Sequence, residues 1–182
     1  CLVSGCVYSQ NMPVFDQGSI LISAPSDSEV IKTEVVCPND SNPMGILMGG
    51  RMVEWMDIAA AVCAQTHAGR ICVTACIQEV HFHAAAKVGD IVTITSRMTR
   101  AFKTSMEVYV HAYPRNVRNT KNQLVCNVYF TFVAMDPRGK AVMVPELKPI
   151  SQTEKEHHTE ALHRKEHLQK QSSHKKARPP EA

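Results

Sequence analysis

One segment constrains the fold of this 182-residue chain more than any other, the apolar run that starts at Gly49. Its apolar residues recur at i, i+3, i+4, i+7, i+8 and i+11, the period of one helical face: Met52, Trp55, Met56, Ala59, Ala60 and Cys63. Ala61, Val62 and Ala64 make the other faces apolar too. A helix of this kind has to be buried, and Gly69 supplies a stop signal behind it.

The segments around this helix are typical of β-strands. "EVIKTEVVC", ending at Cys37, precedes it, and four long runs rich in Val, Ile, Thr, Tyr and Phe follow it, at residues 70–84, 89–101, 104–115 and 122–136. This order predicts an α+β domain over residues 28–150. We expect the last four strands to pair as an antiparallel meander and the sheet to wrap around the helix.

The two ends of the chain carry weaker patterns. Residues 1–27 form an N-terminal extension without a clear element, and "CLVSGC" looks like a lipoprotein cleavage box without the basic and apolar regions that precede one, so we interpret it as a truncated start. Residues 151–170 are charge-laced and predict an exposed helix. The basic end of the 151–182 segment, which also carries Pro, Gln and Ser, is expected to be disordered.

Composition excludes several classes of protein. The net charge is only +3, and the basic residues are not interleaved with aromatics, which make up 5% of the chain, so nucleic-acid binding is not expected. The seven cysteines form no CxxC pair, which argues against zinc and a disulfide framework and favours a reducing cytosol. Without an apolar run of membrane-spanning length, we expect a soluble, cytoplasmic protein with no membrane association.

Several motifs occur in a fixed order between Ser28 and Ile150. They are Asp40, Asn42 and Gly45 in a loop, Gly49 and Gly50 before "MVEWMD", which ends at Asp57, then "VTA" at 73–75, "VGD" at 88–90 and "KTSMEV" at 103–108. In these motifs the chain resembles the hotdog-fold acyl-CoA thioesterases, the group that includes bacterial acyl-CoA thioester hydrolases and the brain acyl-CoA hydrolase. The fold implied by the resemblance is an antiparallel sheet wrapped around a long central helix.

The resemblance implies a role for each matching residue. Asn42 matches the active-site asparagine of the family, Asp57 the catalytic aspartate, and Thr74 a threonine that helps to place the water. In such enzymes the asparagine and the aspartate of one site come from different subunits. The resemblance therefore implies a homo-oligomer with acyl-CoA as its substrate: a dimer with shared sites, commonly a trimer of such dimers, which is a hexamer.

The chemistry of these residues agrees with the resemblance. Thioester hydrolysis needs a positioned water, a base or nucleophile, and donors for the oxyanion. Asp57 is the candidate base or nucleophile, and the backbone N–H groups near Gly49 and Gly50 lack helical partners at the helix start. Asn42 is a further donor. On the helical wheel Asp57 lies at the margin of the apolar stripe, so it should be partly buried.

Each residue also has an ordinary structural interpretation. An early helical acid favours the helix dipole, Asn42 before Pro43 suits a turn, Gly49-Gly50 suits a hinge, and Thr74 suits strand packing. His81 and His83 share a strand face, but without a third ligand at suitable spacing we expect solvent exposure rather than a metal site. No metal or organic cofactor is expected for hydrolysis.

The phosphates of CoA need cations and donors near the mouth of the site. The segment "RMTRAFKTS" places five candidates around an expected strand-to-strand turn: Arg97, Arg100, Lys103, Thr104 and Ser105. Ordinary surface charge is the alternative interpretation of this segment.

Two rival functions use the same fold. "DSNPMG" overlaps the Asp-x-Asn-Pro-x-His motif of hotdog enoyl-CoA hydratases, but Gly45 stands where the proton-carrying histidine is needed. A non-catalytic acyl-CoA sensor is the other alternative, although the N-terminal stretch has no helical period for a DNA-binding segment. Ile46 and Met48 depart from the residues usual in relatives, which affects chain-length preference more than reaction class.

Overall fold

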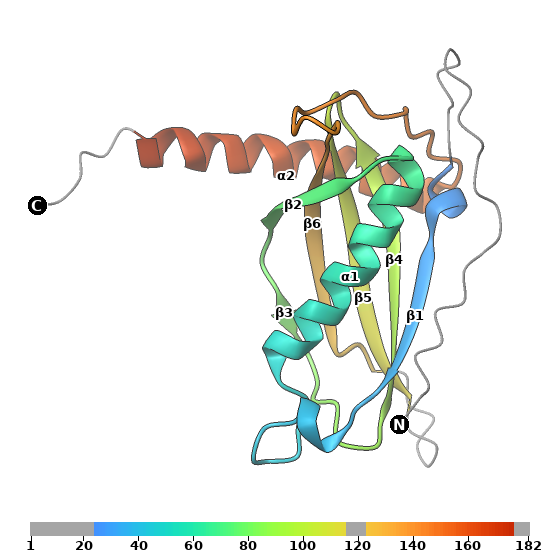
Figure 1. Ribbon diagram of the computed structural model, residues 1–182, viewed down its shortest axis with the longest axis vertical. Coiled ribbons are helices and arrows are strands. Elements are labelled where there is room, and N and C mark those ends of the chain that lie inside the picture. Colours follow the sequence, from blue (N-terminus) through green and yellow to red (C-terminus); the bar gives the residue numbers. More distant parts are fainter. Residues whose placement is uncertain (1–23, 116–122, 177–182) are drawn as a thin grey trace, which may run out of the picture.

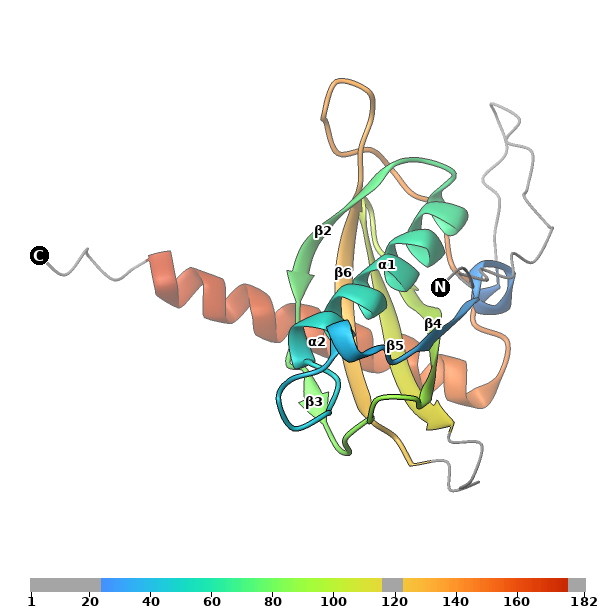
Figure 2. The same cartoon turned by 60° about the horizontal axis from the view of Figure 1, so that its bottom comes forward.

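The computed structural model describes residues 24–115 and 123–176 and has the predicted α+β hotdog architecture. A long helix, α1, lies across one face of an antiparallel sheet, and a second helix, α2, passes across the opposite face (Figures 1 and 2). The helices are α1 (Gly49–Ala68) and α2 (Gln152–Lys176), and two 3-10 turns are η1 (Pro25–Ser28) and η2 (Pro38–Asp40). The strands are β1 (Val30–Val35), β2 (Cys72–Ile77), β3 (His81–Phe82), β4 (Ile91–Ala101), β5 (Ser105–Arg115) and β6 (Cys126–Ala134).

The order of strands in the sheet is β1-β4-β5-β6-β2, with β3 also paired to β6. β4, β5 and β6 form the expected antiparallel meander, but the prediction that the strand after α1 pairs with β4 is wrong. β2 pairs instead with β6, at the far edge from β1. The reason is that α1 crosses the sheet face diagonally, so the chain leaves β1 at one edge and returns at the other (Figure 1).

The segment 70–84 forms two strands rather than one. β2 ends at Ile77, and β3 resumes at His81 with a new register on β6. Between them, the backbone N–H of Gln78 donates to the carbonyl of Tyr129, and its side chain donates to Glu107. The side chain of Gln78 therefore lies on the face of the sheet that carries Glu107, and β2 ends one residue before it.

The core forms where α1 meets the sheet. Alternate residues of β6 are fully buried beneath the helix, namely Cys126, Val128, Phe130, Phe132 and Ala134. Their partners on α1 are the residues expected from the helical period, Met52, Trp55, Met56, Ala59, Ala60 and Cys63, all buried. The helix ends where predicted, because Gly69 adopts the left-handed conformation (φ 59°) that few other residues tolerate.

The expectation that α1 is buried on every side is wrong for this single chain. Ile58 is 45% exposed, and Val53, Ala61 and Val62 are half-buried. The sheet covers one side of the helix only, and the described residues of the chain provide no second layer over the other side.

The C-terminal helix was expected to be exposed, but one of its faces packs on the outer face of the sheet. Ala161 is fully buried, and Arg164 donates to both carboxylate oxygens of Glu107, at 2.8 and 3.1 Å. Glu107 is only 2% exposed and also accepts from Thr99 Oγ1 at 2.7 Å. The helix continues to Lys176, farther than its pattern indicated, and the predictions for residues 1–23 and 177–182 lie outside the described residues.

Neither described helix combines the length and the hydropathy that crossing a membrane requires. The five cysteines within the described ranges, Cys37, Cys63, Cys72, Cys76 and Cys126, are unpaired thiols.

The Glu107–Arg164 pair predicts a large effect on stability. Arg164→Ala should lower the free energy of unfolding by about 3 kcal/mol, because it leaves a buried carboxylate without its cation. Urea denaturation followed by circular dichroism measures this loss. Arg164 also reaches the exposed Glu160 at 3.3 Å, so Glu160→Ala is the matched control, with an expected change within about 0.5 kcal/mol. Equal losses in the free energy of unfolding for the two variants would show that the buried Glu107–Arg164 pair does not stabilise the packing of α2.

Candidate active site

Asp57 and Thr74, 17 residues apart in the sequence, meet on the open side of the molecule. Thr74 Oγ1 donates a hydrogen bond of 2.9 Å to Asp57 Oδ1. Asp57 is half-buried on α1, as its position at the margin of the apolar stripe predicted, and Thr74 is exposed on β2. The structure thus brings together two of the predicted site residues, and the carboxylate is held through one oxygen.

Two features of the fold direct Thr74 toward Asp57. β2 is the last strand of the sheet and lies beside α1, with Thr74 paired opposite Phe132 of β6. Thr74 follows the buried Cys72 at an interval of two residues, so the alternation of the strand puts both side chains on the face toward α1. The register on β6 shifts only after this position, between Thr74 and Cys76.

Asn42 lies in a tight loop before α1 and is not hydrogen-bonded to Asp57. Its Oδ1 accepts from the backbone N–H groups of Met44 and Ile46, at 3.0 and 3.2 Å. The loop closes through the N–H of Gly45, which donates to the carbonyl of Asn42, and Gly45 has the positive φ of 69° that favours glycine. Because both loop donors occupy Oδ1, the amide nitrogen of Asn42 points away from them, and it has no hydrogen-bond partner among the described residues.

The start of α1 presents free backbone donors. No side chain caps the helix, and the first intrahelical bond runs from the N–H of Met52 to the carbonyl of Met48. The N–H groups of Gly49 and Gly50 therefore lack helical partners, as expected at an N-terminus. These donors, at the positive end of the helix dipole, are suited to an oxygen that gains negative charge.

Asp40 fixes this helix start to the loop, a role that sequence patterns did not assign to it. Its carboxylate accepts from Arg51 Nε at 2.9 Å and from the N–H of Cys37 at 3.0 Å, and its carbonyl accepts from the N–H of Met48. Arg51 also donates to Glu54, and the two carboxylates, Glu54 first, raise the pKa of Arg51. The glycine donors and Asn42 therefore belong to one braced unit.

Within one chain the two halves of the candidate site are far apart. Gly49 and Asp57 are separated by eight residues of helix, a rise of roughly 12 Å. A single thioester carbonyl cannot contact both, because catalytic groups must lie within about 3 Å of the reacting atoms.

The residues predicted to bind CoA do not all lie at the β4–β5 turn: Arg97 is within β4, opposite Tyr109, and Arg100 is near its end, whereas Lys103, Thr104 and Ser105 are at the turn. Most of them have partners within the chain. Arg97 pairs with Glu29 through Nε at 3.1 Å, and Arg100 Nη1 donates to the carbonyl of His158 on α2 at 2.8 Å. Lys103 is exposed, and the carbonyl of Thr104 accepts from the N–H of Ala134. Arg97 and Lys103 are both exposed, but Arg97 is paired with Glu29, so Lys103 is the exposed cation of this set that has no ion pair among the described residues.

Helix α2 adds a further cation to this turn, from a segment whose sequence pattern predicted only an exposed helix. Lys165 Nζ lies 3.6 Å from the centre of the Phe102 ring and 3.5 Å from Ser105 Oγ. Arg100 lies over the same ring, at 5.5 Å. Burial first, and then the charge of Arg100, lower the pKa of Lys165.

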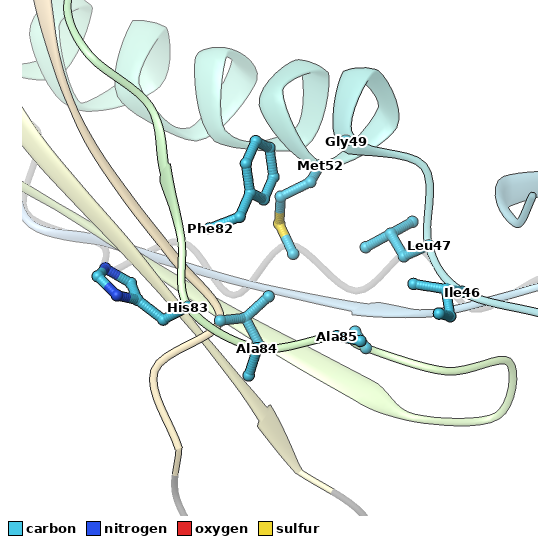
Figure 3. Close-up of a pocket in the computed structure, with 10 residues that line it drawn as sticks. Ile46, Leu47, Gly49, Met52, Phe82, His83, Ala84 and Ala85 are labelled. Atoms are coloured by element: carbon cyan, nitrogen blue, oxygen red, sulfur yellow. The ribbon is translucent and has the colours of Figure 1, made fainter.

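A shallow groove of about 450 Å³ adjoins the helix start (Figure 3). Its walls come from the loop before α1, the first turn of α1 and the segment from β3 to Ala86, and they are apolar apart from His83. Met52, Phe82 and Leu47 point into it, whereas the ring of His83 is directed away (Figure 3) and bonds to Asn127 at 2.6 Å. The lining residues carry no motif from which this groove could have been predicted.

His81 and His83 are both exposed, as expected, with ring centres 6.4 Å apart. Among the described residues, no group of three or more His, Cys, Asp or Glu side chains is arranged to hold a metal ion.

Comparison with known proteins gives consistent matches. The family model of the thioesterase superfamily matches residues 44–120. Mouse acetyl-coenzyme A thioesterase is 34% identical over 155 residues, which are 83% of this chain but 27% of that protein, so the chain spans about a quarter of the mammalian relative. An acyl-CoA thioester hydrolase of Bacillus subtilis is 32% identical over 151 residues, covering 83% of this chain and 88% of that protein.

Solved structures match at similar identity. The acyl-CoA hydrolase of Staphylococcus aureus, solved with butyryl-CoA, CoA and CoA disulfide, has a TM-score of 0.80 and 33% identity over 86% of this chain and 95% of its own. The same hydrolase has been solved with single alanine substitutions of an aspartate, an asparagine and a threonine. A hexameric acyl-CoA thioesterase in its apo form has a TM-score of 0.79 and 35% identity over 83% of this chain and 98% of its own.

Identity above 30% over most of a bacterial relative, together with the same arrangement of sheet and helix in solved hydrolases, places this chain in the hotdog-fold family of acyl-CoA thioesterases.

Proposed function

We propose that this protein is an acyl-CoA thioesterase that hydrolyses acyl-CoA to a free fatty acid and CoA. The observation that carries the proposal is the hydrogen bond between Thr74 and Asp57, at the side of α1 that the sheet leaves open, in a chain of this family. The names of the mouse and Bacillus relatives and the butyryl-CoA bound to the Staphylococcus hydrolase support this substrate class.

The three substituted residues of the Staphylococcus hydrolase support the assignment of Asn42, Asp57 and Thr74. In that protein the asparagine, the aspartate and the threonine follow one another at intervals of 15 and 17 residues. Asn42, Asp57 and Thr74 have the same order, residue types and intervals. We therefore assign these three residues to the catalytic site, together with the N–H groups of Gly49 and Gly50.

The proposed reaction uses water and needs neither a metal nor an organic cofactor. Thr74 holds Asp57 through Oδ1, which leaves Oδ2 to accept a proton from water as that water attacks the carbonyl carbon. The carbonyl oxygen becomes an oxyanion, stabilised by the N–H groups of Gly49 and Gly50, and the Asn42 amide supplies a further donor. When the carbon–sulfur bond breaks, the CoA thiolate takes up the proton that Asp57 accepted from water, which restores the Asp57 carboxylate. Direct attack by the Asp57 carboxylate is the alternative first step.

We propose that each site is shared between two copies of the chain. The separation of roughly 12 Å along α1 prevents Gly49 and Asp57 of one chain from acting on one carbonyl. A second copy resolves this if its Asn42 loop and helix start approach Asp57 of the first. The chain therefore assembles as a homo-oligomer, and the hexamer formed by a relative supports a trimer of such dimers.

The surface around Asp57 has the properties of a subunit contact. Ile58 beside it, Ile71 just before β2, and Val73 and Ile77 on β2 are between 41% and 69% exposed. β2 is an edge strand that pairs only with β6 in the described part of the chain. Exposed apolar residues along an unpaired edge favour association with another chain.

The rival functions have less support. A hydratase requires a histidine where Gly45 closes the Asn42 loop in a left-handed conformation. A sensor needs acyl-CoA binding without turnover, and release of free CoA detected with a thiol reagent distinguishes the two. The unpaired thiols of the described residues fit the reducing cytosol as the proposed location.

Replacing Asp57 tests the proposed chemistry. Asp57→Asn should lower kcat/KM for acyl-CoA by about 100-fold or more, because the amide cannot accept the proton from water. The control is Glu166→Gln, an exposed acid on α2 outside the proposed site, which should change activity by less than about twofold. Steady-state assays with a thiol reagent measure both. Full activity of Asp57→Asn in a protein that melts like the wild type would reject this role.

Mixing two inactive variants tests the shared site. Asn42→Ala and Asp57→Ala should each be inactive alone and regain activity when their subunits exchange, because some mixed dimers carry one site with both residues intact. Native mass spectrometry verifies the exchange, and an unmixed sample of each variant treated in the same way is the control. Verified exchange without any recovered activity would place Asn42 and Asp57 of one site on the same chain.

The exposed cation at the β4–β5 turn tests the proposed CoA contacts. Lys103→Ala should raise KM for acyl-CoA by about threefold, and leave KM for an acyl-pantetheine thioester unchanged, because only CoA carries the nucleotide phosphates. Lys140→Ala, at an exposed turn after β6, is the control. An equal rise for both substrates would contradict phosphate recognition. Arg100 is less suitable for this test because it also fastens α2.

A further inference from the structure

The groove beside the helix start has a shape and lining that the proposed chemistry does not yet use. Gly49 forms one of its edges, so the groove begins at a proposed oxyanion donor. The remaining walls come from apolar side chains, chiefly Leu47, Met52, Phe82, Ala84, Ala86 and Val125. A fatty acyl chain extends directly from the carbonyl carbon, so an apolar channel starting at the oxyanion donors matches the substrate in both position and chemistry.

The exposure of Phe82 is unusual for a ring in this setting. It is 54% exposed, although it lies against the first turn of α1. A Cβ atom on Gly49 would lie 3.1 Å from Phe82 Cζ, so glycine at this position allows the ring to approach the helix start closely. An aromatic ring held half open beside a groove offers apolar area to a ligand that covers it.

The wall of the groove formed by residues 84–86 has small side chains, and backbone hydrogen bonds hold it in place. The run Ala84-Ala85-Ala86 contributes only methyl groups, which leaves the groove open between the loop and β3. The N–H of Leu47 donates to the carbonyl of Ala86 at 2.8 Å, and the N–H of His83 donates to the carbonyl of Val125 at 2.7 Å. These bonds fix both walls, so the groove is formed before any ligand binds.

We propose that this groove binds the acyl chain of the substrate, and that Phe82 and the three alanines set the chain length. The inference rests on the proposed function and extends it. The groove is open rather than closed, so medium and longer acyl chains gain apolar contacts that an acetyl group cannot make. The enzyme therefore prefers medium and longer acyl-CoA thioesters to acetyl-CoA.

Binding of non-hydrolysable thioethers tests the groove independently of turnover. Calorimetry with S-ethyl-CoA and S-octyl-CoA gives the two dissociation constants. The wild type should bind the octyl compound at least about tenfold more tightly. Ala84→Leu should weaken octyl binding about tenfold, because the larger side chain fills the groove, while ethyl binding stays within about twofold.

Two further variants complete the design. Ala85→Leu also narrows the groove, and Ala85 is exposed, so its replacement tests the proposal even if Ala84→Leu does not fold. Ala141→Leu, at an exposed position outside the groove, is the control and should leave both affinities unchanged. A wild type without chain-length preference, or groove variants that weaken both thioethers equally, would overturn the proposal. If the groove variants dissociate into single subunits but still bind S-octyl-CoA more tightly than S-ethyl-CoA, the groove is a contact between copies of the chain. That result would also overturn the proposal.

The same measurements separate the two proposals. Chain-length-dependent binding without CoA release from any acyl-CoA would leave the groove in place and reject the thioesterase function. Rapid hydrolysis of acyl-CoA, together with thioether affinities that do not depend on chain length, would support the thioesterase function and reject the groove as the acyl-binding site.

Discussion

The burial of α1 is the constraint on which the rest of the structure depends. The helix is apolar nearly all round, and its own sheet covers one side of it. The covered side forms the core with β4, β5 and β6. The uncovered side carries Asp57, Ile58 and the neighbouring edge strand β2. A carboxylate is tolerated on such a helix because it lies at the boundary, where Thr74 and solvent satisfy it.

The parts of the fold that depend on local pattern could be predicted from the sequence. The 3.6-residue period and Gly69 define α1 from end to end, because burial of one face and a left-handed stop are local requirements. Alternation in β4, β5 and β6 is equally clear. The partial burial of Asp57 followed from its angle on the helical wheel, and the presence of Thr74 in the same site followed only from the resemblance to a family, whereas their hydrogen bond was not predicted.

The parts that depend on distant contacts could not be predicted. The side of the sheet that β2 joins is decided by the diagonal path of α1, and no pattern within residues 70–84 encodes it. Gln78 at the break between β2 and β3 and Arg164 on α2 both donate to the buried carboxylate of Glu107, which accepts hydrogen bonds from three segments of the chain. From sequence alone, a glutamate in a strand is predicted to face solvent, because the helix that covers it cannot be identified.

Glu107 and Asp57 show how the two faces of one sheet divide stability from chemistry. On the outer face, Glu107 is enclosed by Arg164, Thr99 and Gln78, and fixed donors occupy both of its carboxylate oxygens. On the inner face, Asp57 has one fixed donor and keeps an oxygen available. The incomplete pairing of Asp57 is a cost to a single folded chain, and it is what the proposed reaction requires. A second copy that covers Ile58 and β2 would remove water from around that oxygen and strengthen its interaction with the attacking water, so assembly and catalysis would depend on the same exposed surface.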